Sequence, residues 1–472
     1  MQTNPLRHLP SVNELLESPH LKNLVDKVSH NVVVTEVRSF LDGIRTDIQH
    51  KAADMNIPTP TEMAEHIANW IVTDQQPKLR PVINATGILL HTGLGRAPLA
   101  KEALDEIQAI AAGYASVEVD LETGERSQRV QSVERLILEI VGGEAAVVVN
   151  NNAGATLLTL AALAEDKEVI VSRGHLVEIG GSYRLPDVME ASHARLREVG
   201  TTNKTRIGDF QNAINELTGA VMSVHTSNYV IAGFAEQPTL AELVQLGRSH
   251  KLPVIHDIGS GALVDFSKYG LPGEPLPSDS LQEGADVVLF SGDKLLGGPQ
   301  CGIVVGKKQL IAKIAKHPLS RALRVDKVTL AALAATLKLY RDPERAENAI
   351  PLLGMLNTSM DNLRNRAERL APQIKELPNI ESADVVESVT YLGGGTVPTQ
   401  QLPTVCIAIS PQGVQIDDLA GRLRVGDPAV FGRIHQGRLY LDLRSVLPNQ
   451  DLQLLDALKK TDSQPAENES GQ

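Results

Sequence analysis

The chain has 472 residues, 42% apolar and 22% charged, which is the balance of a soluble globular protein long enough for two or three domains. Its 45 Lys and Arg residues against 57 Asp and Glu residues give a net charge of −12, so no overall basic field attracts nucleic acid. Any RNA contact must therefore be local. Two cysteines, Cys301 and Cys406, are too few and too far apart for a disulfide framework or a cysteine-based zinc site, which indicates the cytoplasm.

The N-terminal sequence MQTNPLRHLPSVNELL lacks the basic-then-apolar layout of a signal peptide. No apolar run approaches the roughly 18 residues that span a bilayer. We therefore expect a soluble protein without a membrane segment.

Residues 1–75 are predicted to form a small helical domain, because apolar residues such as Leu21 with Leu24 and Val37 with Leu41 recur at spacings of three and four. Acidic residues outnumber basic ones there, so the segment shows no stripe of positive charge. The following QQPKLRP is typical of a linker.

Residues 80–330 alternate short β-branched runs with helical stretches, which predicts an α/β core with a mostly parallel sheet. The expected strands are AAVVVN at 145–150, EVIVS at 168–172, AVMSVH at 220–225, PVIHD at 253–257, DVVLFS at 286–291 and GIVVG at 302–306. Residues 331–460, with strands TVCIAIS and GRLYLDLR, predict a smaller α+β domain. The polar tail 461–472 is expected to be disordered.

The segment DVVLFSGDKLLGGPQCG presents a lysine after an apolar strand. Ser291 closes the predicted strand, and Lys294 precedes the glycine pair 297–298. Open α/β sheets bind ligands at the carboxyl ends of their strands, and a desolvated lysine there can form a Schiff base with a cofactor. The alternative is a solvated lysine in an ordinary turn.

An aspartate ends the predicted strand 37 positions earlier (294 − 257) in PVIHDIGSGALVD. Asp257 could pair with the protonated ring nitrogen of pyridoxal phosphate and keep that ring an electron sink. The alternative is a helix N-cap. The neighbouring His256 points to the opposite face of the strand and is interpreted as a packed histidine.

A phosphate cradle is predicted at residues 151–156, where AAVVVNNNAGATLL gives a strand, a short turn and a helix with unpaired N–H groups. Its members are Asn151, Asn152, Ala153 and Gly154. Ser227 or Asn228, in SVHTSNY, could reach the phenolic oxygen of the cofactor, although a buried turn explains that segment equally well. Phosphate-loop, dinucleotide, serine-hydrolase and zinc-protease motifs are absent from the sequence.

Several segments together resemble one bacterial family, selenocysteine synthase or L-seryl-tRNA(Sec) selenium transferase. They are INATGILLHTGLGRAPL, VVNNNAGA, SRGHLVEIGGSYRLPDVM, REVGTTNKT, VHTSNY, DIGSGALVD, FSGDKLLGGPQCGIVVG and HPLSRALRVDK, and the likeness runs from HLPSVNELL to GRLYLDLR. Two positions depart from the pattern: His175 replaces an expected acidic residue, and Gly154 an expected alanine.

The resemblance implies a fold-type-I pyridoxal-phosphate enzyme that assembles as a ring of dimers, with a decamer expected. It further implies that Lys294 forms the Schiff base with pyridoxal 5'-phosphate and that Arg96, Arg321 and Arg324 bind the anionic selenium donor. Surface solvation is the alternative for these arginines. The N-terminal helices would bind tRNA.

The reaction implied is the conversion of L-seryl-tRNA(Sec), through a dehydroalanyl-tRNA intermediate, to selenocysteinyl-tRNA(Sec) with selenophosphate as the donor. Two alternatives remain. One is a pyridoxal-phosphate lyase acting on a small amino acid or amino sugar, against which the N-terminal helices argue. The other is a noncatalytic tRNA-binding protein, against which the presence of both Lys294 and Asp257 argues.

Overall fold

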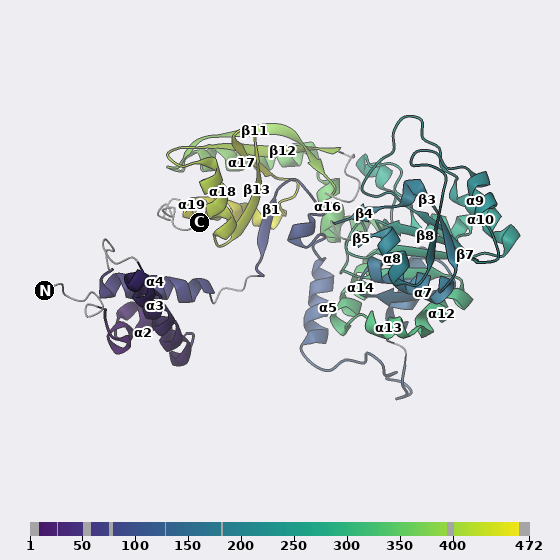
Figure 1. Ribbon diagram of the computed structural model, residues 1–472. Helices are drawn as coiled ribbons and strands as arrows, with labels where there is room; N and C mark the ends of the chain where they lie inside the picture. The colour runs from purple at the N-terminus through teal and green to yellow at the C-terminus, as the bar shows by residue number, and fades with distance from the viewer. Residues whose placement is uncertain are drawn as a thin grey trace. The chain divides into compact units, whose positions relative to one another are not determined.

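The computed structural model describes residues 9–25, 27–50, 58–74, 79–127, 129–180, 183–393 and 401–461. The predicted disordered tail lies outside these residues except for Thr461, which directly follows the last helix. The chain forms two compact units, Met1–Pro81 and Val82–Gln472 (Figure 1). None of the described helices is both long enough and apolar enough to cross a membrane.

The first unit is built from helices α1 (Val12–Leu16), α2 (Pro19–Val25), α3 (His30–His50) and α4 (Pro60–Asp74). Ser11 and Glu14 form a reciprocal capping box that fixes the start of α1. The apolar positions at helical spacing are buried in a core of this unit's own, which includes Leu21, Val37 and Met63.

A seven-stranded sheet forms the centre of the second unit, in the order β2-β10-β9-β8-β7-β3-β6. Its strands are β2 (Ala145–Val149), β3 (Glu168–Ser172), β6 (Arg195–Val199), β7 (Thr218–Val224), β8 (Val254–Gly259), β9 (Val287–Ser291) and β10 (Gly302–Gly306). Strands β9, β8, β7, β3 and β6 pair in parallel, and only β10 is antiparallel to its neighbours, which confirms the predicted α/β core with a mostly parallel sheet.

Helices cover both faces of this sheet, which explains its nearly continuous apolar strands (Figure 1). On one face lie α7 (Asn152–Ala164), α8 (Leu185–Ala191) and α12 (Lys308–Lys316). The other face carries α6 (Gln131–Val141), α9 (Ile207–Ala213), α10 (Leu240–His250) and α11 (Pro277–Glu283). Beyond α6 pack α5 (Lys101–Ala111), α14 (Lys327–Leu339), α15 (Pro343–Ala349) and α16 (Pro351–Asn357). The short elements are α13 (Pro318–Ala322), the hairpin of β4 (Glu178–Ile179) and β5 (Tyr183–Arg184), and the 3-10 turns η2 (Thr92–Leu94), η3 (Arg173–His175) and η4 (Phe266–Tyr269).

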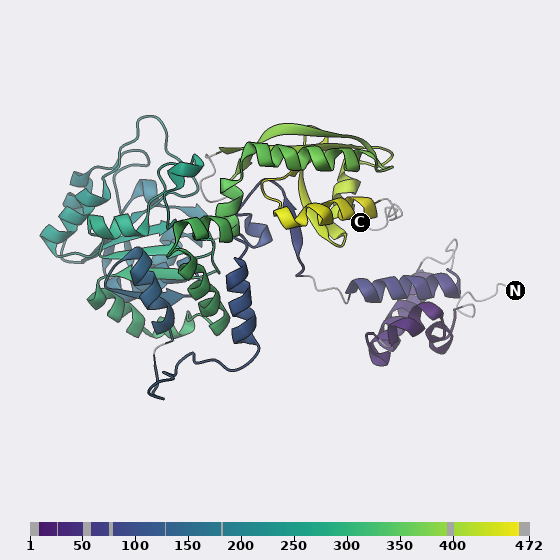
Figure 2. The ribbon, with the colours of Figure 1, turned by 180° about the vertical axis from the view of Figure 1, so that it is seen from behind.

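A second sheet has the order β1-β13-β14-β12-β11. Its strands are β1 (Val82–Ala85), β11 (Ile380–Tyr391), β12 (Gln401–Pro411), β13 (Ala429–His435) and β14 (Arg438–Asp442). Helices α17 (Met360–Lys375), α18 (Ile416–Val425) and α19 (Asp451–Lys460), the last preceded by η5 (Pro448–Gln450), pack on it, and α17 and α19 lie side by side in Figure 2.

Two boundaries differ from the sequence-based division at residues 80 and 331. Strand β1 pairs in parallel with β13, so the smaller sheet takes one strand from before the larger sheet. Helices α14 to α16 pack into the core of the larger sheet rather than the smaller one. The first difference arises from strand pairing and the second from helix packing between segments distant in the sequence, which local patterns do not encode.

Candidate active site

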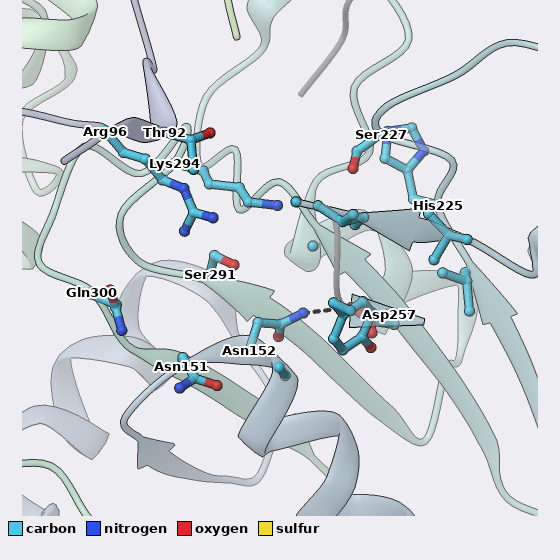
Figure 3. A pocket seen from close by; sticks show the side chains of 17 residues that line it. Thr92, Arg96, Asn151, Asn152, His225, Ser227, Asp257, Ser291, Lys294 and Gln300 are labelled. Atoms are coloured by element: carbon cyan, nitrogen blue, oxygen red, sulfur yellow. Dashed lines mark hydrogen bonds between the residues drawn. The ribbon is translucent and has the colours of Figure 1, made fainter. Parts of the chain in front are cut away.

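The carboxyl ends of β2, β7, β8 and β9 meet at one edge of the large sheet. Because β10 is antiparallel to both β2 and β9, β2 runs in the same direction as the parallel strands. A cavity of about 350 Å³ opens at this edge (Figure 3). Its lining residues are Thr92, Arg96, Asn151, Asn152, Ala153, Val177, Ile179, Gly180, Tyr183, Val224, His225, Ser227, Asp257, Gly259, Ser291, Lys294 and Gln300.

Lys294 reaches this cavity from the loop that follows β9. The backbone N–H of Gly297 donates to the Lys294 carbonyl at 2.9 Å, and the positive φ of Gly297 (70°) lets the chain turn there. Lys294 is only 6% exposed. Burial, followed by the positive charge of Arg96, lowers the pKa of Lys294, which favours the neutral amine that Schiff-base and base chemistry require.

Asp257 lies on β8 facing the same space and is 4% exposed. Its Oδ1 accepts from Nδ2 of Asn152 at 2.9 Å, and its Oδ2 accepts from the hydroxyl of Thr156 at 2.9 Å. Burial nevertheless raises the pKa of this carboxyl, against the opposing effect of these two hydrogen bonds and of Lys294. A carboxylate in this position therefore has a strong physical need for a cationic partner.

The two groups face one another across a glycine. A side-chain carbon placed on Gly259 would lie 3.9 Å from Nζ of Lys294 and 4.0 Å from Oδ1 of Asp257. A side chain here would project into the space between the amine and the carboxylate, and glycine leaves that space open.

The strand-turn-helix after β2 supplies part of the predicted phosphate cradle. Asn151 is the N-cap of α7, and its Oδ1 accepts from the Gly154 N–H at 2.7 Å. Asn151, Asn152 and Ala153 line the cavity, whereas Gly154 does not. The Asn152 side chain is directed to Asp257 rather than to a phosphate position, as the dashed line in Figure 3 shows.

The segment after β7 lines the cavity with residues that differ in part from those expected. Ser227 lines it, but Asn228 does not, because the Asn228 amide donates to the Glu178 carbonyl at 2.7 Å. Ser291, at the end of β9, does line it.

The three predicted anion-binding arginines are divided between two cavities. Arg96 lines the first cavity, where its Nη1 donates to Oδ2 of Asp293 at 2.8 Å. Arg321 and Arg324 line a second cavity of about 820 Å³, together with Arg126 and Arg129. Within this chain the expected cluster of three arginines is therefore not formed.

Sequence reasoning missed four cavity residues that carry polar groups: Thr92, Tyr183, His225 and Gln300. His225 directly follows β7, so the strand-end argument used for Asp257 and Lys294 could have found it. Burial, followed by the charge of Asp257, raises the pKa of Tyr183. Figure 3 shows Arg96 and Lys294 on one side of the cavity and His225 with Ser227 on the other.

The two histidines singled out from the sequence lie outside the lining of the cavity. His256 is buried with its Nδ1 3.0 Å from the Ser280 hydroxyl, and burial lowers its pKa to about 3. The Nδ1 of His175 accepts from the Val224 N–H at 3.3 Å, and burial lowers the pKa of His175 to about 4. Both are therefore neutral at pH 7.

These residues fit pyridoxal phosphate by their chemistry. The buried Asp257 requires a cation, the helix start at Asn151 offers N–H groups to a phosphate, and Lys294 is the buried amine of the cavity. Among the described residues, no group of three His, Cys, Asp or Glu side chains could hold a metal ion.

Comparison with known proteins extends the likeness over nearly the whole chain. The family described as L-seryl-tRNA selenium transferase matches residues 82–447, and the one described as selenocysteine synthase N terminal matches residues 6–45. The L-seryl-tRNA(Sec) selenium transferase of Carboxydothermus hydrogenoformans is 45% identical over 94% of this chain and 95% of its own. That of Geobacter sulfurreducens is 43% identical over 96% of this chain and 98% of its own.

A solved structure shows the same fold. D-glucosaminate-6-phosphate ammonia-lyase aligns with a TM-score of 0.59 and 21% identity over 82% of this chain and 96% of its own. The family match and the relatives' identity and coverage decide the assignment: the chain belongs to the L-seryl-tRNA selenium transferase family of pyridoxal-phosphate-dependent, fold-type-I enzymes.

Proposed function

We propose that this protein converts L-seryl-tRNA(Sec) to L-selenocysteinyl-tRNA(Sec) at the cavity of Lys294 and Asp257, with selenophosphate as the selenium donor. The observation that carries the proposal is the family match to both units, at residues 6–45 and 82–447. A lyase that acts on a small molecule would require only the unit that contains the cavity.

The polar residues of the cavity have roles in the proposed reaction that follow from their chemistry. When bound, pyridoxal phosphate supplies an electron sink for the electrons left at Cα of the seryl group. Asp257 would hold the proton on the ring nitrogen, and Asn151 with Ala153 would hold the phosphate at the start of α7. Lys294, with its lowered pKa, accepts the Cα proton.

Arg96 is proposed to bind the phosphate of the selenium donor, and the position of its guanidinium beside Lys294 in Figure 3 supports this role. Arg321 and Arg324 are proposed to bind anions at the second cavity.

The resemblance supports a ring of dimers, whose size light scattering would determine. The two buried, unpaired cysteines support a reducing compartment, as in the cytoplasm.

The test is incubation of the purified protein with seryl-tRNA(Sec) and selenophosphate, followed by hydrolysis of the ester and identification of the amino acid. Selenocysteine formation that depends on the donor supports the proposal. Ammonia release from free serine or an amino-sugar phosphate, with no change in the charged tRNA, would favour the lyase. Binding of tRNA without conversion would favour a noncatalytic protein.

A further inference from the structure

A buried carboxylate lies behind the cavity at His225. Glu274 belongs to the loop between η4 and α11, and its side chain is 2% exposed. Its Oε2 lies 3.6 Å from Nε2 of His225. Within the described part of the chain, neither of these two atoms has a hydrogen-bond partner.

An unpartnered carboxylate oxygen in the interior is costly unless a charge or a proton compensates it. The imidazole of His225 is the group that faces Oε2 of Glu274, so one proton shared by the pair removes the cost. The 3.6 Å between Nε2 and Oε2 exceeds hydrogen-bond length, so the two atoms would bond only after a rotation of either side chain. This geometry would let the pair hold a proton at the wall of the cavity.

The charged and titratable groups around His225 favour this pairing. His175 and His256 lie close enough for His225 to affect them, and both have lowered pKa values, mainly because of burial. Neither therefore competes for the proton. Lys294 lies within the electrostatic reach of Glu274, and Asp257 already accepts hydrogen bonds from Asn152 and Thr156. Glu274 is thus the carboxylate that pairs with His225.

The proposed reaction has a step that requires such a proton. Loss of the seryl hydroxyl breaks the Cβ–O bond, and the bonding electrons leave with oxygen. Hydroxide is a poor leaving group, so a proton must reach that oxygen in the same step. Lys294 has just accepted the Cα proton. A second acid on the opposite side of the cavity can protonate the seryl oxygen, so Lys294 need not transfer the same proton to it.

We propose that His225 is the catalytic acid that protonates the departing seryl oxygen, and that Glu274 is the positioning residue that orients and charges its imidazole. The inference rests on the proposed function. In the step, Lys294 gains the Cα proton, a Cα=Cβ double bond forms in the seryl group, and the charged imidazole of His225 gives its Nδ1 proton to the oxygen, which departs as water. Nε2 keeps its proton, directed to Glu274. Solvent then returns a proton to the His225–Glu274 pair.

The test separates removal of the Cα proton from loss of the hydroxyl. Exchange of the Cα hydrogen of seryl-tRNA(Sec) with D₂O reports the first event, and donor-dependent selenocysteine formation reports both. In Glu274→Gln and His225→Gln we expect exchange within about threefold of the unmodified protein and product formation slower by about 100-fold. Glu274→Asp is expected to recover part of the rate. The control Glu347→Gln breaks the surface pair with Lys268 and is expected to change neither measurement.

The outcomes distinguish the two proposals. Equal loss of exchange and product in both variants, or full product formation in Glu274→Gln, would overturn the role of the pair while leaving the proposed function in place. Absence of exchange and product in the unmodified protein would overturn the proposed function and the inference together. The absorbance of bound cofactor checks that each variant folds and loads.

A second readout needs neither cofactor nor substrate. In the cofactor-free protein labelled with ¹⁵N-histidine, the signal lost in His225→Gln belongs to His225. We expect that signal to remain that of a charged imidazole to a higher pH in the unmodified protein than in Glu274→Gln. An identical pH dependence in both would contradict the pairing. As the pH is raised, the rate of product formation should likewise begin to fall at a lower pH in Glu274→Gln than in the unmodified protein.

Discussion

At Asp257, burial and hydrogen bonding act in opposite directions on one carboxyl group. Asn152 and Thr156 stabilise the charged form, yet burial outweighs them and raises the pKa of Asp257. A protonated ring nitrogen would supply the missing charge. Asp257→Asn is therefore expected to keep the cofactor bound, because the start of α7 remains, and to lower turnover by at least about 100-fold.

Single-turnover kinetics of Cα-proton exchange would measure this loss, and cofactor absorbance would serve as the control for binding. Exchange at the unmodified rate in Asp257→Asn would mean that another group supports the ring nitrogen.

His256 gives a prediction on stability. Burial lowers its pKa from 6.5 to about 3. As the pH falls below 6.5, His256 therefore binds a proton in the unfolded chain but stays neutral in the folded chain until the pH approaches 3. Its contribution to the free energy of unfolding is thus present above about pH 6.5 and is lost as the pH falls towards 3. Between pH 7 and pH 5 the loss is about 2 kcal/mol.

Denaturant unfolding of His256→Gln at these two pH values, at a fixed protein concentration, checks this expectation. The loss of stability between pH 7 and pH 5 should be about 2 kcal/mol smaller in the variant than in the unmodified protein. An identical loss in both proteins would mean that His256 binds its proton in the folded state.

The site residues that the sequence could predict are those whose role follows from position along the chain. Lys294 follows a buried strand and Asp257 lies near the end of another, and parallel strands bring such positions to one edge. Glu274 could not be predicted in this way, because it comes from an irregular loop and its partner His225 is distant in sequence. Gly154 falls outside the cavity because its N–H bonds locally to Asn151, and Asn228 because its amide bonds to the Glu178 carbonyl, a partner distant in sequence.

At the scale of elements, six strands of the larger sheet were predictable from β-branched runs, and the seventh was not. Strand β6 lies at the edge of the sheet and carries Arg195, Arg197 and Glu198, so it lacks an apolar run. Charged edge strands of this kind block pairing with other chains. Strand β1 was likewise missed because its partner β13 lies more than 300 residues later in the chain, from Ala429 onward.

Gly261 controls how closely the ends of β8 and β9 approach. A side-chain carbon there would lie 2.3 Å from the Ser291 carbonyl oxygen, and its φ is 74°. Gly261→Ala is therefore expected to displace the Lys294 loop, to weaken cofactor binding and to destabilise the fold. Gly270 has nearly the same φ, 78°, but no atom lies within 4 Å of such a carbon.

Gly270→Ala is thus a matched control that carries only the backbone cost of about 1–2 kcal/mol. Gly261→Ala should lose about 1–3 kcal/mol more, because of the clash. Thermal unfolding and cofactor retention on gel filtration measure both effects. Equal behaviour of the two variants would show that the ends of β8 and β9 tolerate a wider separation.

At the scale of the whole molecule, the cavity belongs entirely to the unit Val82–Gln472, and the unit Met1–Pro81 has a core of its own. Deleting residues 1–81 is therefore expected to leave a folded, cofactor-loaded protein that no longer binds tRNA. Arg38 and Arg45 are exposed on α3 and are candidate contacts, as is Lys51, which lies outside the described residues. Arg45 already pairs with Asp42 at 2.6 Å.

Filter binding of the full and shortened chains at two salt concentrations measures the effect. Affinity of the full chain should fall with salt along a shallow slope, because few basic residues are available for phosphate contacts. Equal affinity of both chains would move tRNA recognition to the larger unit and would reopen the small-molecule lyase as an alternative.

The Lys294 amine at the carboxyl end of β9 is proposed to bind pyridoxal phosphate opposite Asp257. Borohydride reduction of the yellow protein, followed by proteolysis and mass spectrometry, identifies the lysine that carries the cofactor, because reduction makes the linkage permanent. We expect a pyridoxyl group on the peptide that contains Lys294 and none in Lys294→Ala. A pyridoxyl group on any other lysine of the unmodified protein would contradict it.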